Sequence, residues 1–222
     1  MPFRRSGMTL VNDAPVNSAP AWQVLHNNAV FNFRNFWDGR ANNTFNAGDP
    51  FGLRNPNTFI WQTINGVIQQ VAVALPSSSL ASQASGPPLS AFEMSCNGRT
   101  FALLGKKLLQ LKPLSGQQID ANDSVLDSVA AQRLTGTDPT YLQMAQAAFQ
   151  PSFWDSPLLV AITAADARKA ASMDLVTKPK KDPATQYFTQ AESNFSLFFG
   201  LALQLYQATL VSNDSPFDRF SR

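Results

Sequence analysis

The sequence is poor in cysteine and histidine: its 222 residues include one of each, Cys96 and His26. A single cysteine excludes a disulfide within this sequence, and the two residues together cannot build a zinc finger or a metal cage of cysteine and histidine. A Cys-x-x-Cys-His haem-attachment motif is excluded as well. A Ser-His-Asp or Cys-His catalytic site would have to use one of these residues, and neither stands in a recognisable nucleophile motif.

Charged residues are also scarce, at 14% of the sequence, and 17 Lys and Arg nearly balance 15 Asp and Glu, for a formal net charge of +2. No face-length run of basic residues occurs, so the sequence offers little electrostatic support for binding nucleic acid. It contains no apolar stretch of about 18 residues, and no apolar run follows the arginines near its start. We therefore expect no membrane span, and no signal peptide is visible.

Apolar and aromatic side chains are plentiful, at 44% and 11% of the residues, with 17 phenylalanines. This composition is typical of a globular domain and argues against a coiled coil or a disordered chain. Residues 1–24 differ, because they are polar and have no sustained period of 2 or 3.6 residues. We interpret them as an extended N-terminal arm and residues 25–220 as one domain.

Helices are expected at four places, the first and last from apolar residues that recur every three to four positions and the middle two from helix-capping residues at Asp123 and Thr137. They span about residues 100–111, 123–134, 137–149 and 184–210. A small β-hairpin is expected near residues 59–73, because Asn65-Gly66 lies between two β-prone runs and accepts the positive φ angles of a two-residue turn. The predicted fold class is mainly α with a small β-hairpin insertion.

Two places in the sequence could carry chemistry. Glu93 lies among apolar residues after a Gly-Pro-Pro break, a setting that suits a general acid or base, and a glutamate at a helix start is the alternative interpretation. Trp37 stands beside Asp38 and Arg40, where an indole could seal an ion pair or relay electrons.

We interpret Cys96 as a small buried hydrophobic residue. His26 is interpreted as a surface or capping histidine.

Two motifs occur in order along the chain. Asn28 to Ala41 contains Asn-Ala-x-Phe followed by Phe-Trp-Asp-Gly-Arg-Ala, and Gln83-Ala-Ser-Gly-Pro-Pro is followed by Glu93-Met94, with ten positions from the glutamine to the glutamate. Both resemble signature elements of the bacterial di-haem cytochrome c peroxidases. The segment from 194 to 220 resembles the helix that closes the haem domain of that family.

The resemblance implies a cytochrome c-like domain and a haem oxidoreductase of the peroxidase type. By the same resemblance, Glu93 is the catalytic acid and base that moves a proton between the peroxide oxygens, and Gln83 is its hydrogen-bond partner. Trp37 is the electron relay, with Asp38 and Arg40 in support. The implied cofactor is c-type haem, and the implied partners are hydrogen peroxide or dioxygen, a small electron-donor redox protein and a second haem domain. The implied location is the periplasm or the cell exterior.

The sequence departs from the family because it lacks both Cys-x-x-Cys-His motifs, so it cannot attach haem covalently or supply their iron-ligating histidine. We therefore expect an incomplete portion of a longer di-haem protein, inactive alone and without any metal ligand of its own. Alternatives stay open: a haem-less binding or structural module on the same scaffold, and a chain that takes up haem non-covalently or borrows a ligand. The 46 positions between Trp37 and Gln83 also resemble long-insert relatives that include rubber-cleaving oxygenases, so dioxygen chemistry stays open.

Overall fold

The computed structural model describes residues 4–5, 8–9, 34–120, 122–123, 126–163, 172–209 and 216–221. Its helices are α2 (Ser79–Ala84), α3 (Phe101–Leu108), α4 (Asp127–Leu134), α5 (Tyr141–Ala148), α6 (Gln190–Ser193), α7 (Phe195–Thr209) and α8 (Pro216–Ser221). Single 3₁₀ turns are η1 (Gly52–Arg54), η2 (Pro87–Leu89) and η3 (Pro151–Phe153). Within these ranges no helix has the length and apolar character needed to cross a membrane.

The strands are β1 (Arg4–Arg5), β2 (Met8–Thr9), β3 (Arg34–Asn35), β4 (Ala41–Asn42), β5 (Ile60–Ile64), β6 (Val67–Val71), β7 (Leu159–Thr163), β8 (Ser172–Val176) and β9 (Thr185–Phe188). They form three antiparallel pairs, β1-β2, β3-β4 and β5-β6, and one antiparallel sheet of order β8-β7-β9. The predicted mainly α fold class is therefore wrong. Short apolar runs such as Leu159–Thr163 have no decisive period, so the sequence did not distinguish these strands from pieces of helix.

The hairpin expected around Asn65-Gly66 is present as β5 and β6, with Ile64 opposite Val67 next to the turn. Asn65 and Gly66 have φ angles of 51° and 77°, which is the left-handed conformation that this turn requires. The arm predicted for residues 1–24 lies almost entirely outside the described residues.

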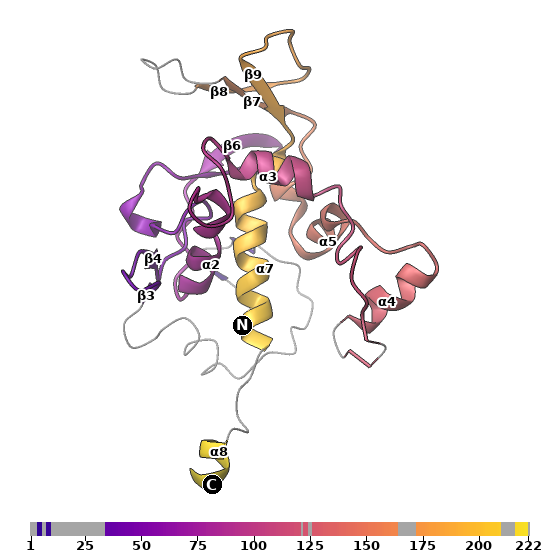
Figure 1. The fold of residues 1–222 in the computed structure, drawn as a ribbon. Coiled ribbons are helices and arrows are strands. Elements are labelled where there is room, and N and C mark those ends of the chain that lie inside the picture. The colour runs from indigo at the N-terminus through magenta and orange to yellow at the C-terminus, as the bar shows by residue number, and fades with distance from the viewer. Residues whose placement is uncertain are drawn as a thin grey trace.

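The core forms around α7, which runs through the middle of the molecule with α2 beside it and α3 across one end (Figure 1). Leu197 and Leu201 of α7 are fully buried, as is Phe45. Gly200 allows that ring to approach, because a Cβ atom there would lie 2.7 Å from the Cζ of Phe45. Gly105 does the same where α3 crosses α6, since its Cβ would lie 2.7 Å from the backbone oxygen of Glu192.

The single helix predicted for residues 184–210 is instead β9, α6 and α7 in succession. Thr189 and Glu192 form a capping box, in which the Thr189 hydroxyl accepts from Glu192 N at 3.2 Å and the Glu192 carboxylate accepts from Thr189 N at 2.8 Å. This box starts a new helix at Gln190, so the preceding residues are left to pair as a strand. Helices α3, α4 and α5 lie where helices were expected and are shorter than predicted.

Two buried amide side chains join the C-terminal helices to the rest of the fold. Asn194 donates to the backbone oxygens of Trp61 and Phe153, each at 2.7 Å, and accepts from Trp61 N at 2.8 Å. Gln190 donates to the backbone oxygens of Trp61 at 2.9 Å and Ser152 at 2.8 Å. We call the side chains of Gln190 and Asn194 the amide clasp. The clasp fixes the β5-β6 hairpin and the η3 turn against α6 and α7.

Candidate functional site

The first motif forms a sharp turn between β3 and β4. Gly39 donates its N–H to the Phe36 backbone oxygen at 3.0 Å, and both residues have positive φ angles, 67° and 66°. A Cβ atom at Gly39 would also lie 3.3 Å from the side chain of Arg34, so a larger residue is disfavoured there. The turn directs the Arg40 side chain toward the second motif.

Arg40 connects the two motifs. Its Nη1 lies 3.2 Å from Asp38 Oδ2 and its Nη2 lies 3.4 Å from Glu93 Oε1. The guanidinium carbon also lies 4.0 Å from the centroid of the Phe36 ring, within cation–π range. We call Phe36, Asp38, Arg40 and Glu93 the Arg40 cluster. Partial burial raises the pKa of the Asp38 carboxyl, but hydrogen bonds from the Arg40 backbone N–H and guanidinium outweigh it, so this pKa lies below its usual value.

The second motif approaches the first through Gly86. A Cβ atom at Gly86 would lie 3.2 Å from the Cζ of Phe36, so the glycine leaves room for that ring. Beyond η2, the backbone oxygen of Ser90 accepts from Glu93 N at 3.2 Å and from Ser95 N at 2.9 Å. Glu93 therefore lies in a turn, and the alternative of a helix-start glutamate is wrong, because α3 begins at Phe101.

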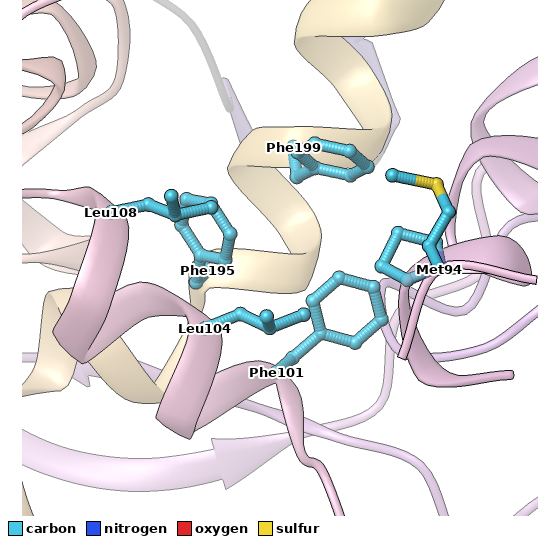
Figure 2. Close-up of a pocket in the computed structure, with 7 residues that line it drawn as sticks. Met94, Phe101, Leu104, Leu108, Phe195 and Phe199 are labelled. Carbon is cyan, nitrogen blue, oxygen red and sulfur yellow. The ribbon is translucent and has the colours of Figure 1, made fainter. Parts of the chain in front are cut away.

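A small apolar groove of about 90 Å³ lies between α3, α7 and the segment after α2 (Figure 2). Pro88, Met94, Phe101, Leu104, Leu108, Phe195 and Phe199 line it. Figure 2 shows Met94 at one end, with its thioether beside the Phe199 ring. Glu93 directly precedes Met94 in the sequence, so the Arg40 cluster and the groove meet through the backbone at these two residues.

A family model described as "Di-haem cytochrome c peroxidase" matches residues 4–222. The chain belongs to this family. The match covers both motifs and confirms the resemblance drawn from them. No curated protein and no solved structure matches the chain. Haem oxidoreductase chemistry of the peroxidase type is therefore the chemistry of its family.

The structure joins Asp38, Arg40 and Glu93 by ion pairs, and between described residues no hydrogen bond or ion pair links the Trp37 or Gln83 side chain to them. Trp37 is 94% exposed, and it is the Phe36 ring, not the indole, that lies against the Arg40 guanidinium. Gln83 is half-buried on α2, and its side chain makes no hydrogen bond to any described residue.

Sequence reasoning missed the groove, although part of its signal was visible. Phe101, Leu104 and Leu108 recur at the spacing of one helix face, which indicated a buried stripe without showing that part of it stays open. Cys96, expected to be buried, is exposed, and Arg99 Nη2 lies 3.9 Å from its sulfur. That expectation was wrong because Cys96 lies in a loop before α3 and not on a packed face. His26 lies outside the described residues.

The donor atoms near the groove do not fit a covalently attached haem. Such a haem needs two cysteine sulfurs and a proximal histidine. Met94 offers one thioether, and Cys96 offers one exposed thiol. Over the described ranges, no three His, Cys, Asp or Glu side chains gather in a group able to hold a metal ion. The groove supplies an apolar wall and the Met94 thioether, without the two cysteines and the histidine that a covalently attached haem requires.

Proposed function

We propose that this chain is one part of a di-haem peroxidase that reduces hydrogen peroxide to water with electrons from a small redox protein. The observation that supports the proposal is the Arg40–Glu93 ion pair, 3.4 Å long, which joins the two family motifs. In this proposal the haem ligands come from polypeptide other than the described residues, because the donor set there does not fit them. By the family resemblance we also propose a periplasmic or extracellular location.

Glu93 is proposed to carry the proton chemistry. Cleavage of the O–O bond of peroxide needs a proton moved from one oxygen to the other, and two electrons and two further protons then yield two water molecules. The Glu93 carboxylate is solvent-accessible and held by one ion pair, so it can exchange a proton with a bound molecule. Arg40 is proposed as a positioning residue, because it fixes the carboxylate from the opposite motif.

Gln83 and Trp37 have more distant proposed roles. Gln83 is proposed to hydrogen-bond the substrate, and its side chain has no hydrogen-bond partner among the described residues to compete with that role. Trp37 is proposed as an electron relay toward a second domain. Its 94% exposure suits an indole that becomes covered when another domain docks.

The experiment is a haem titration of the purified chain, followed by peroxide turnover with an artificial electron donor. With imidazole supplied in place of the missing proximal histidine, we expect a Soret band that saturates and turnover that falls about 100-fold in Glu93→Gln. Asp174→Asn is the matched control, because Asp174 is an exposed carboxylate on β8, and it should keep full turnover. Equal turnover in Glu93→Gln and the parent chain would refute the role of Glu93.

A haem-less binding module is the second candidate. It is favoured because the described residues lack the two cysteines and the histidine that attach and ligate a haem. Phe92 is 100% exposed and Met94 is 70% exposed, so apolar side chains project into solvent next to the groove. In this case haem titration should give a linear, non-saturating Soret signal and no peroxide turnover. A saturating Soret band would refute the second candidate.

A further inference from the structure

A second surface, outside the Arg40 cluster, gathers positive charge from two segments that are far apart in sequence. Five exposed lysines form it, two on α3 and three in the loop between β8 and β9: Lys106, Lys107, Lys178, Lys180 and Lys181. We call these five the lysine patch. Tyr187 of β9 joins the two segments, because its backbone oxygen accepts from Lys106 Nζ at 3.0 Å and its hydroxyl accepts from Lys180 N at 3.0 Å.

The five lysines outnumber the one acidic residue of their own loop, Asp182. Asp182 lies within the loop, but its carboxylate accepts from the Thr185 hydroxyl at 2.5 Å and from Ala184 N at 3.0 Å. These hydrogen bonds, that of Thr185 first, hold the pKa of Asp182 below its usual value, so its carboxylate offsets one of the five positive charges and the patch stays positive. Between described residues, no ion pair involves a lysine of the patch.

The charge distribution of the whole chain makes the patch distinctive. The formal net charge is only +2, so the removal of five positive charges leaves the rest of the chain with a net negative charge. A surface of one sign on a nearly neutral protein steers and orients a partner of the opposite sign. The loop is also held in place by the Tyr187 and Asp182 hydrogen bonds, which lowers the entropy cost of binding.

The patch also lies close to the groove. Lys106 follows Phe101 by five residues and precedes Leu108 by two, so it faces away from the side of α3 that lines the groove. Lys107 lies three residues after Leu104, so it stands beside the side of α3 that lines the groove. Figure 1 shows the sheet of β7, β8 and β9 projecting beyond α3, and the loop between β8 and β9, which carries three of the lysines, projects with it.

We propose that the lysine patch is a docking surface for a small acidic protein. That this protein is the electron donor of the peroxidase rests on the function proposed above, whereas the docking itself does not. The complementary charge favours an acidic protein, and the positive charge that the described residues give this surface comes from lysines, whereas base recognition in nucleic acids commonly uses arginine.

The test measures binding of the full chain to a plant-type ferredoxin, which is a small acidic iron–sulfur protein, with basic mitochondrial cytochrome c as the opposite-charge control. We expect saturable binding of ferredoxin that weakens about tenfold or more between about 20 and about 200 mM salt, and none of cytochrome c. Lys107→Glu with Lys181→Glu should weaken ferredoxin binding at least about tenfold.

A control variant lowers the net charge by the same four units at a distant site. It replaces four exposed neutral residues on and before α4 with glutamate: Gln117, Gln118, Ala131 and Gln132. This variant should bind ferredoxin within about threefold of the parent chain, because the lysine patch is intact. Circular dichroism should show the same fold in all three proteins.

Equal weakening by both variants would refute the proposal, since net charge alone would then explain binding. Tighter, patch-dependent binding to phosphatidylserine vesicles or to single-stranded DNA than to ferredoxin would also overturn it. Turnover with the artificial donor should be unchanged in the lysine variant, because that donor needs no docking. Failure of the Glu93→Gln prediction with ferredoxin binding intact would therefore count against the peroxidase function only.

Discussion

The amide clasp and the Arg40 cluster both join segments that are distant in sequence, but they use different groups at different depths. Gln190 and Asn194 are fully buried, neutral and bonded to backbone atoms. Arg40, Asp38 and Glu93 are charged, partly exposed and bonded mainly to one another.

The difference separates what holds the fold from what can take part in chemistry. A buried amide that saturates backbone groups cannot be removed without leaving those groups unpaired, which is costly. An exposed ion pair exchanges with water at little cost, so its carboxylate stays available to a substrate. Stability should therefore depend on the clasp, and activity on the cluster.

Replacement of Asn194 should have the largest effect on stability. Asn194→Ala leaves Trp61 N and the Phe153 backbone oxygen without this partner in the core, so we expect a loss of about 3 kcal/mol in the free energy of unfolding. Urea denaturation measures it. Asn57→Ala, at an exposed side chain, is the control and should change the free energy by less than about 0.5 kcal/mol. Equal losses in the two variants would contradict the role of the clasp.

A methyl group at Gly105 should be the next most costly change. Its Cβ would lie 2.7 Å from the Glu192 backbone oxygen and 2.8 Å from Phe195 Cβ, so α3 would have to move away from α6. We expect Gly105→Ala to lower the free energy of unfolding by about 2 kcal/mol. Gly116→Ala is the control, because nothing lies within 4 Å of its Cβ position. A melting temperature for Gly105→Ala equal to that of the control would disprove the close packing.

The Lys112–Asp138 ion pair is intermediate in burial between the amide clasp and the Arg40 cluster. Its Lys112 ammonium lies 2.8 Å from the mostly buried carboxylate of Asp138. The hydrogen bond from Lys112 holds the pKa of Asp138 below its usual value. The pair therefore adds stability above the unfolded-state pKa, about 4, and this contribution is lost as pH falls through the lower folded-state pKa. Urea denaturation should show Asp138→Asn less stable than the parent chain at neutral pH, with the gap closing at strongly acidic pH. A gap independent of pH would contradict this assignment.

The smallest effect on stability is expected at the Arg40 cluster. Arg40→Met removes two exposed ion pairs but keeps an apolar stem over the Phe36 ring, so the urea midpoint should stay close to that of the parent chain. If this variant unfolds as readily as Asn194→Ala, the contrast between the two regions is lost. Peroxide turnover of the haem-loaded chain should fall in Arg40→Met, because Glu93 is no longer held in place.

Local signals explain which parts of the fold were predictable. The Asn65-Gly66 turn and the apolar spacing of Phe101 to Leu108 are properties of neighbouring residues, and both elements are present. The break before α6 was also encoded locally, in the Thr189–Glu192 capping box, but apolar residues on either side continued the helical spacing and concealed it. The β8-β7-β9 sheet depends on pairing between distant segments, which no local pattern specifies.

The site was predictable only as a list of residues. The motifs named Asp38, Arg40 and Glu93, but their contact depends on the turn at Gly39 and on the space left at Gly86 for the Phe36 ring. Neither feature follows from residue spacing. The exposure of Trp37 likewise depends on the path of the backbone, which turns the indole outward while Phe36 points inward.

The amide clasp can form only after the ribosome has synthesised the chain as far as Asn194. Asn194 is 133 residues downstream of Trp61, the residue whose backbone it secures. At about 5 to 20 residues per second, synthesis of that interval takes on the order of ten seconds. During this time the β5-β6 hairpin has already been made, but α7, against which it is held, does not yet exist. During this interval the nascent chain exposes the apolar side chains that α7 covers in the folded protein. Chaperones bind exposed apolar segments of this kind.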